Sequence, residues 1–333
     1  MLLAPLAGVS DVAFRQMCLE HGAQLTFTEM VSAKGLSYSN ERTIHLVDLA
    51  HGESHVGVQL FGHEPSTMAS QAAWLEEHLG EALAVIDVNM GCPARKIVSK
   101  GDGAALLCDL ELARDIIEQI ARAVQVPVSV KMRRAYDQGP DVAPELARIA
   151  EAAGASAVTV HGRYATQMYR GPSDWNVIAQ VKQSVTIPVI GNGDIRCGDD
   201  AVAMVRQTGC DSVMVARGAQ GNPWVFEDIR AAFAREFGSA ECAAFVPPTA
   251  QQRIAAARRQ TELLEQLDPR AVVRMRKHAS WYVKGLPGAS QARAAFNECS
   301  TASEFFRVFD QLLEYLREFA EEQQVGSSQE FLS

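Results

Sequence analysis

The chain has 333 residues, of which 47% are hydrophobic and 21% are charged, and its formal net charge is −9. This composition is ordinary for a globular protein with one large domain and a small one, and no apolar run approaches the ~20 residues of a membrane helix. The acidic total argues against a protein that binds nucleic acid over its whole surface.

The seven cysteines are scattered and include no CxxC pair. That distribution argues against a zinc site and against a disulfide framework, and it is typical of the reducing cytoplasm. The first residues, MLLAPLAGVSD, have no basic segment and are too short for a signal peptide. We therefore expect a cytoplasmic protein without a membrane span or a bound metal.

Short β-branched runs alternate with helical patterns over the first two-thirds of the chain. Eight such strands over roughly 225 residues predict an α/β fold, a (β/α)8 TIM barrel. The alternative is an open doubly wound sheet, which usually carries a GxGxxG turn after its first strand, and no such turn is present. Glycines at 22, 80, 154 and 209 are typical of helix ends. The expected strands are Leu2–Ala4, Leu25–Thr28, His55–Leu60, Leu83–Val88, Val126–Lys131, Ala157–Val160, Ile187–Ile190 and Ser212–Val215, and two clear helices are Asp109–Ala123 and Pro144–Ala153.

After Phe237 the pattern changes to helices alone. The stretch Gly238–Thr249 contains two adjacent prolines and is typical of a linker. Thr301 and Glu304 have the spacing of a capping box at the start of the last helix. We expect a barrel domain over 1–240, a small all-helical C-terminal domain over 250–322 and a flexible tail over 323–333. The expected helices are Ala250–Leu267, Pro269–Val283, Ser290–Cys299 and Ala302–Glu321.

Positive charge concentrates in the helical part. Between Arg253 and Arg293 there are nine Lys or Arg residues and three Asp or Glu residues, so this segment carries about +6 and the remainder about −15. A local basic face on an acidic protein can hold a phosphate backbone. The alternative is a solvated helix surface, and the sequence leaves the two open.

One stretch, AVIDVNMGCPARKIVSK at 84–100, carries the strongest sign of chemistry. An apolar run ends at Asn89, and Cys92 follows between a glycine and a proline. Catalytic groups of parallel α/β folds lie on loops at the carboxyl ends of strands. Most cysteines are small buried hydrophobic residues without a chemical role, but this position favours an active thiol. The basic residues that follow predict an anionic ligand.

The other strand ends supply polar groups for the same face. Gln59 ends the third expected strand, Lys131 the fifth and His161 the sixth, with Arg163 beyond it. Loops after strands seven and eight of such barrels often bind phosphate, and here they carry GNGD at 191–194 and Arg217. We therefore expect a ligand with one phosphate and a flat polar ring, and flavin mononucleotide (FMN) meets these conditions.

Several motifs together resemble the tRNA-dihydrouridine synthases, most closely the bacterial B-type (nitrogen-regulation-like) branch. They are APLAGVSDVAFR, TEMVSAKGL, VQLFG, DVNMGCPARKIVSKGDGAALL, VKMR, VTVHGR, IPVIGNGDI, VMVARGAQGNPWVF and, in the helical part, RMRKHASWYVKGL. The resemblance implies an enzyme that uses FMN and NADPH to reduce the C5–C6 double bond of a uridine in tRNA. The resemblance to this branch favours a uridine of the D-loop, at the elbow of the tRNA.

The resemblance also implies roles for single residues. Cys92 is expected to be the proton donor, and Asn89 to contact the uracil. Lys131 and Arg163 are expected to stabilise the charge that develops, and Arg274 and Lys277 belong to the helices expected to bind the tRNA backbone. The expected FMN contacts are Pro5, Leu6, Ala7, Gln59, Lys131, His161, Asn192, Gly193, Asp194, Ala216 and Arg217.

Two departures from the family pattern stand out. The chain begins almost on the first strand, so we expect either a differently covered barrel end or a true start upstream of Met1. Ala216 stands where glycine is common, and its methyl group is a candidate for crowding a phosphate. The rival hypotheses are a flavin barrel acting on a free small molecule and a non-catalytic RNA-binding or regulatory relative.

Overall fold

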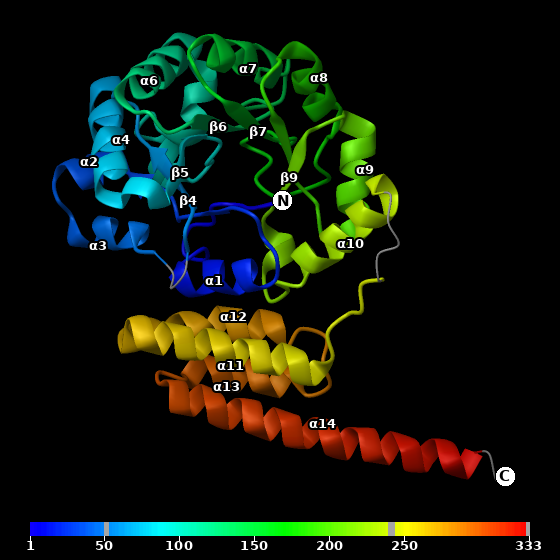
Figure 1. Cartoon of the computed structure of the whole chain (residues 1–333). Helices are drawn as coiled ribbons and strands as arrows, with labels where there is room; N and C mark the ends of the chain where they lie inside the picture. The colour runs from blue at the N-terminus through cyan, green and yellow to red at the C-terminus, as the bar shows by residue number, and fades with distance from the viewer. Residues whose placement is uncertain (50–52, 239–243, 331–333) are drawn as a thin grey trace. The chain divides into compact units, whose positions relative to one another are not determined.

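The first part of the chain forms a barrel of parallel strands (Figure 1). The computed structural model describes residues 1–49, 53–238 and 244–330. Within them, the hydrogen-bonded strands follow the order β1-β9-β8-β7-β6-β5-β4-β2, and a parallel bridge between Leu2 and Leu25 joins the two ends of that order. The predicted TIM barrel is confirmed. The strands are β1 Leu2–Leu3, β2 Thr26–Phe27, β4 Val56–Phe61, β5 Leu83–Met90, β6 Val128–Arg133, β7 Ala157–His161, β8 Val189–Asn192 and β9 Ser212–Val215.

A ninth strand, β3 (Val31–Ser32), was not expected, and it pairs with the end of β4. Helices surround the strands on the outside (Figure 1), and consecutive helices from α6 to α10 contact one another. The helices of this part are α1 Val12–Glu20, α2 Ala33–Ser37, α3 Glu41–Ile44, α4 Pro65–Leu79, α5 Arg95–Val98, α6 Leu110–Ala123, α7 Ala143–Ala152, α8 Asn176–Ser184, α9 Gly198–Thr208 and α10 Val225–Phe237. The glycines at 22, 80, 154 and 209 all have positive φ angles, as expected for helix ends.

Side chains alternate along each strand between the helices and the barrel interior. In β5, for example, Ile86, Val88 and Met90 are fully buried, while Asp87 and Asn89 on the other face make hydrogen bonds with β4. A separate apolar cluster is made by Ala4, Phe27, Ile190 and Met214. The barrel strands therefore carry an apolar cluster and a set of polar side chains, and the polar set includes five of the predicted site residues: Gln59, Asn89, Lys131, His161 and Asn192.

The second compact unit is helical. It comprises Val246–Ser333 together with the short segment Ala219–Trp224, which the sequence had assigned to the barrel domain. That segment belongs here because the Trp224 ring makes an edge contact with Tyr282 at 6.4 Å. A Cβ on Gly221 would also lie 2.4 Å from the backbone of Trp281. The helices are α11 Ala250–Leu267, α12 Met275–Tyr282, α13 Ala289–Glu298 and α14 Ala302–Glu330.

Details of this unit differ from the sequence prediction in two places. The expected helix Pro269–Val283 is divided into a 3-10 turn, Pro269–Arg274, and α12. Helix α14 continues to Glu330, into the range for which we expected a tail, and residues 331–333 lie outside the described part. The capping box is confirmed, because the Thr301 backbone N–H donates to Glu304 and the Glu304 N–H to the Thr301 hydroxyl. Of the expected linker, residues 239–243 lie outside the description.

Candidate active site

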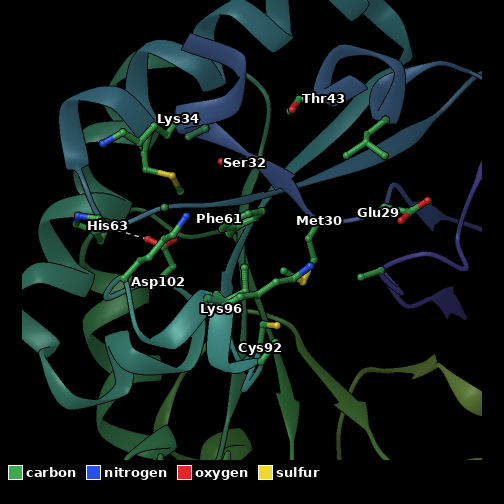
Figure 2. Close-up of a pocket in the computed structure, with 18 of the residues that line it drawn as sticks. Glu29, Met30, Ser32, Lys34, Thr43, Phe61, His63, Cys92, Lys96 and Asp102 are labelled. Atoms are coloured by element: carbon green, nitrogen blue, oxygen red, sulfur yellow. Dashed lines mark hydrogen bonds and ion pairs between the residues drawn. The ribbon is translucent and has the colours of Figure 1, made fainter. Parts of the chain in front are cut away.

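A pocket of about 1220 Å³ opens at the carboxyl ends of the first strands and the loop that carries Cys92 (Figure 2). Its walls come from four segments that follow β1, β2, β4 and β5. The pocket is lined by Ala7, Gly8, Glu29, Met30, Ser32, Ala33, Lys34, Thr43, Leu46, Phe61, Gly62, His63, Glu64, Thr67, Met68, Cys92, Ala94, Lys96, Ile97, Ser99, Lys100 and Asp102. This is the face on which parallel barrels carry their chemistry.

Cys92 is half-buried, and its backbone is held on both sides. Its N–H donates to the Asn89 side-chain oxygen at 2.9 Å, and its carbonyl accepts from the N–H of Ala104 at 3.0 Å. Gly103 lies against it with a φ angle of +61°, and a Cβ there would be 2.8 Å from the Cys92 carbonyl oxygen. The loop therefore presents the thiol from a fixed backbone, with Lys96 and Lys100 on the same stretch of chain.

Gln59 and Asn89 lie side by side in neighbouring strands. The Asn89 amide nitrogen donates to the Gln59 side-chain oxygen at 2.7 Å, and the Gln59 nitrogen donates to Asp87 at 2.6 Å. Asp87 also accepts a bond of 2.6 Å from the hydroxyl of Ser129. Gln59 and Asp87 are fully buried and Asn89 is nearly so. Each of the two side-chain amide groups keeps one N–H beyond these bonds, and of the two residues only Asn89 retains some exposed surface.

Lys131 lies on β6, opposite Asn89 in the strand register. Its ammonium group donates to the side-chain oxygen of Asn192 at 3.0 Å, and Asn192 donates in turn to the carbonyl of Met214. Burial lowers the pKa of Lys131 to about 8, with the carboxylate of Asp87 opposing that shift. Lys131 therefore remains mainly positive at neutral pH.

His161 and Arg163 form one buried group at the end of β7. Arg163 donates to both oxygens of Asp194 at 2.7 Å, to the carbonyl of Gly171 at 2.6 Å and to the Nε2 atom of His161 at 3.2 Å. Burial, followed by the nearby cations, lowers the pKa of His161 well below its ordinary value, so the ring is neutral. A guanidinium can only donate, so the proton of the neutral ring lies on Nδ1.

This environment assigns Arg163 a different use from the one expected. Its side chain is 3% exposed and is occupied by protein acceptors, so it orients Asp194 and His161 rather than lying open to a substrate. Burial raises the pKa of Asp194, but hydrogen bonds from Arg163 and from the Ser173 backbone outweigh this and hold the pKa below its ordinary value. Asp194 is also one of three non-glycine residues with a positive φ angle in the described chain.

The expected phosphate end contains a tightly packed glycine. Gly193 has a φ angle of +120°, and a Cβ there would lie 2.5 Å from the Ser173 hydroxyl and 2.8 Å from the His161 ring. The Ser173 hydroxyl is buried and has no hydrogen-bond partner within the described residues. Arg217 is 44% exposed, lies 3.4 Å from Asp194 and stacks over the exposed Tyr169 ring at 4.7 Å.

The remaining predicted residues lie in three places. Pro5 and Leu6 are half-buried after β1, and Ala7 lines the pocket. Ala216 packs against the apolar cluster inside the barrel, which accounts for its methyl group without any phosphate. Arg274 and Lys277 belong to the helical unit, where Arg274 is exposed and Lys277 half-buried.

Sequence reasoning passed over Asp87, Ser129 and the His63–Asp102 pair. His63 and Asp102 are 2.7 Å apart and join two walls of the pocket (Figure 2). The signal for Asp87 was present, because a carboxylate inside an apolar strand needs buried partners. Its partners come from strands far away in sequence, so spacing alone did not reveal them.

The donor set is of the kind that FMN needs: Lys131 and Gln59 for a polar ring, and Arg217 with the buried Ser173 hydroxyl for a phosphate. Among the described residues, no cluster of His, Cys, Asp and Glu is arranged to hold a metal ion. Nor does any helix in the described ranges combine the length and apolarity needed to cross a membrane.

Comparisons with known proteins give a consistent result. The dihydrouridine synthase family model matches residues 2–322. tRNA-dihydrouridine synthase B of Xanthomonas campestris is 37% identical over 90% of this chain and 89% of its own, and the enzyme of that name from Pseudomonas aeruginosa is 37% identical over 92% of both. A probable tRNA-dihydrouridine synthase of Mycobacterium tuberculosis is 39% identical over 94% of this chain and 82% of its own. A solved nitroalkane oxidase of Streptomyces ansochromogenes, 20% identical, covers 98% of this chain and 96% of its own with a TM-score of 0.38, too distant a likeness to bear on function.

Proposed function

The chain belongs to the dihydrouridine synthase family, and from that membership and the geometry at the strand ends we propose that it reduces a uridine of tRNA to dihydrouridine. The observation that carries the proposal is the placement of Cys92. Its backbone is fixed at the wall of the large pocket, and its amide is joined through Asn89 and Gln59 to the polar interior of the barrel. We further propose FMN as the cofactor, NADPH as the reductant and the D-loop as the substrate region.

FMN, which Lys131 and Arg217 would help to hold, would supply the hydride for C6 of the uracil, with NADPH as the source of the electrons. Cys92 donates its thiol proton to C5, which completes the reduction of the double bond, and a proton from solvent restores the thiol. Lys131, which is mainly positive at neutral pH, stabilises the negative charge that develops on the uracil. Asn89 keeps one N–H with which to orient the base.

The buried group at the end of β7 prepares the cofactor site. Arg163 fixes Asp194 and the neutral His161 ring, while the exposed Arg217 and the buried Ser173 hydroxyl remain to hold a phosphate. An exposed guanidinium binds phosphate with paired donors. Arg163 therefore contributes to binding through the residues that it positions.

The helical unit supplies the proposed grip on tRNA. The segment from Arg253 to Arg293 carries about +6 on a chain whose total is −9, and Arg274 lies exposed within it. Cations of this kind bind the phosphate backbone without reading bases, and the uridine must leave the folded tRNA to reach the pocket. Family membership favours this substrate over a free small molecule.

An absorbance spectrum of the purified protein tests the cofactor first. We expect the two bands of an oxidised flavin, and we expect both to bleach when NADPH is added without oxygen. A colourless protein that takes up no FMN on reconstitution would refute the cofactor, and a flavin that bleaches only with another reductant would refute NADPH.

A further inference from the structure

Asp87 is a buried carboxylate for which neither a catalytic role nor a binding role is evident. It is fully buried in β5, two residues before Asn89. One oxygen accepts from the hydroxyl of Ser129 and the other from the Gln59 side-chain nitrogen, both at 2.6 Å. Burial raises the pKa of Asp87 to about 6, and Lys131 is the charged group that opposes this shift. Burying an ionised carboxylate costs free energy, so the presence of Asp87 in the barrel interior calls for an explanation.

Three successive hydrogen bonds lead from this carboxylate to the loop of the thiol. Gln59 donates to Asp87, and its oxygen accepts from the Asn89 nitrogen at 2.7 Å. The oxygen of Asn89 accepts from the backbone N–H of Gly91 at 3.1 Å and from that of Cys92 at 2.9 Å. The carboxylate is therefore connected to the Cys92 backbone through two side-chain amide groups.

The direction of this chain of bonds is fixed from both ends. The backbone N–H of Cys92 can only donate, so Asn89 must turn its oxygen to it and its nitrogen to Gln59. Gln59 must then turn its oxygen to Asn89 and its nitrogen to position 87, where an acceptor is required. An ionised carboxylate can only accept hydrogen bonds, so Asp87 provides the acceptor that the Gln59 nitrogen requires. Reversing either amide group would bring two donors or two acceptors together in a buried place, which is costly.

We propose that Asp87 is a positioning residue: acting through Gln59 and Asn89, it holds the amide groups in one orientation and so fixes the backbone from which Cys92 presents its thiol. The hydrogen bond between the Ala104 N–H and the Cys92 carbonyl supports this, because it fixes the same residue from the opposite side. The role in presenting a reacting thiol rests on the proposed function, whereas the direction of the hydrogen bonds does not.

Exchanging the two side chains tests the direction without changing any volume. Asn89→Asp places an acceptor-only group on each side of Gln59, so the Gln59 oxygen must face one carboxylate. Asp87→Asn alone keeps the direction, because the new amide nitrogen can turn to the Ser129 hydroxyl while its oxygen still accepts from Gln59. In the double variant Gln59 turns over: it donates to the carboxylate now at position 89 and accepts from the amide now at position 87, and every group is again satisfied.

We expect the rate of dihydrouridine formation to fall by on the order of tenfold to a hundredfold in Asn89→Asp. Asp87→Asn should slow the reaction less than Asn89→Asp, because its amide can keep the direction of the bonds. The double variant should regain the part of the loss that comes from the misdirected Gln59, while the N–H that Asn89 offers the base stays lost. If the two substitutions act independently, so that the double variant is no faster than Asn89→Asp, the proposal is refuted.

The pH dependence of urea unfolding gives a readout without tRNA or flavin. In Asn89→Asp one carboxyl group beside Gln59 must take up a proton in the folded state, so its pKa is raised. The protein is then most stable at pH values below the pKa that this carboxyl group has in the unfolded chain. Its free energy of unfolding falls as the pH rises through the pKa that the group has in the folded protein. We expect the free energy of unfolding of Asn89→Asp to fall more steeply with rising pH than that of the wild type. In the double variant this slope should return to the wild-type value. An unchanged slope in Asn89→Asp would contradict the proposal.

Ser129→Ala separates hydrogen-bond direction from simple charge. Without the hydroxyl, the amide nitrogen that Asp87→Asn introduces has no acceptor on that side and competes for Gln59. Asp87→Asn should therefore lower the free energy of unfolding in the Ser129→Ala background. If repulsion between charges explains everything, the effects of these two substitutions will add, and that result overturns the proposal. Should the wild type bleach with NADPH yet form no dihydrouridine, the proposed function fails, while both unfolding series still decide the role of Asp87.

Discussion

Arg163 and Arg217 both pair with Asp194, but the structure predicts opposite consequences when each is replaced by lysine. Arg163 is 3% exposed and makes bonds of 2.7 Å to both oxygens of Asp194, along with its bonds to Gly171 and His161. Arg217 is 44% exposed and 3.4 Å away. The buried pair should therefore support the fold, and the exposed arginine should be available to the ligand.

The magnitudes follow from burial and geometry. Removing one member of a buried, hydrogen-bonded ion pair costs about 3 to 5 kcal/mol, and lysine cannot reproduce a paired guanidinium contact. We expect Arg163→Lys to lower the free energy of unfolding by about 3 kcal/mol because it keeps the charge but loses most of these bonds. An exposed pair contributes about 0 to 1 kcal/mol, so Arg217→Lys should leave stability nearly unchanged.

Urea unfolding and FMN titration, carried out on both variants, form the assay. Arg217→Lys should weaken FMN binding by on the order of tenfold, since one charge-assisted hydrogen bond is lost, while its urea midpoint stays at the wild-type value. If Arg163→Lys unfolds within about 0.5 kcal/mol of the wild type, the role we assign to the buried pair is wrong. Equal loss of stability in both variants would contradict the reasoning from burial.

Four further predictions concern the thiol, the interior, the phosphate end and the helical unit. Cys92→Ala should retain FMN and slow dihydrouridine formation by about 10²- to 10⁴-fold, the usual contribution of a general acid. Because the pKa of Asp87 is raised to about 6, stability should fall by roughly 3 kcal/mol as the pH rises from about 4 to 6, and Asp87→Asn should remove that slope. Gly193→Ala should lower FMN occupancy and cost about 2 to 4 kcal/mol, because its Cβ would meet two buried side chains. Arg274→Glu with Lys277→Glu should weaken tRNA binding without loss of FMN.

Two of these predictions have a matched control variant, and each of the other two has a result that would contradict it. Cys108→Ala, at an exposed cysteine outside the pocket lining, should keep full activity, and full activity in Cys92→Ala would refute the proton donor. Gly209 also has a positive φ angle, of +69°, but the nearest atom to an added Cβ is 3.9 Å away, so Gly209→Ala should cost less than Gly193→Ala. If the free energy of unfolding of Asp87→Asn still falls with rising pH as in the wild type, groups other than Asp87 cause this pH dependence and the prediction is wrong. Unchanged tRNA binding in the double charge reversal would refute the helical grip.

The barrel and the position of its reactive face were predictable from sequence because strand ends follow a simple rule. Each short apolar run ends near a polar residue, so Asn89, Lys131, His161 and Asn192 could be placed toward the carboxyl ends of their strands from the sequence, and the structure has them there. The glycines that end helices were equally readable, since a positive φ angle leaves few other choices.

The contacts among these residues were not predictable. The partners of Asp87 come from strands 28 and 42 residues away, and spacing in the sequence does not report such pairs. The burial of Arg163 depends on Asp194, 31 residues further on, and a charged residue is ordinarily expected at the surface. The segment Ala219–Trp224 groups with the helical unit through tertiary contacts such as Trp224 on Tyr282, which spacing in the sequence does not report.

The most direct test of the central claim is the modification of tRNA itself. The purified protein, loaded with FMN and supplied with NADPH, is incubated with tRNA that lacks dihydrouridine, and the nucleosides are then analysed by mass spectrometry. We predict that one or more uridines gain two hydrogen atoms, and that Cys92→Ala abolishes most of this gain while still being reduced by NADPH. If the wild-type protein is reduced by NADPH but leaves every uridine unchanged, the assignment of tRNA reduction to this site is contradicted.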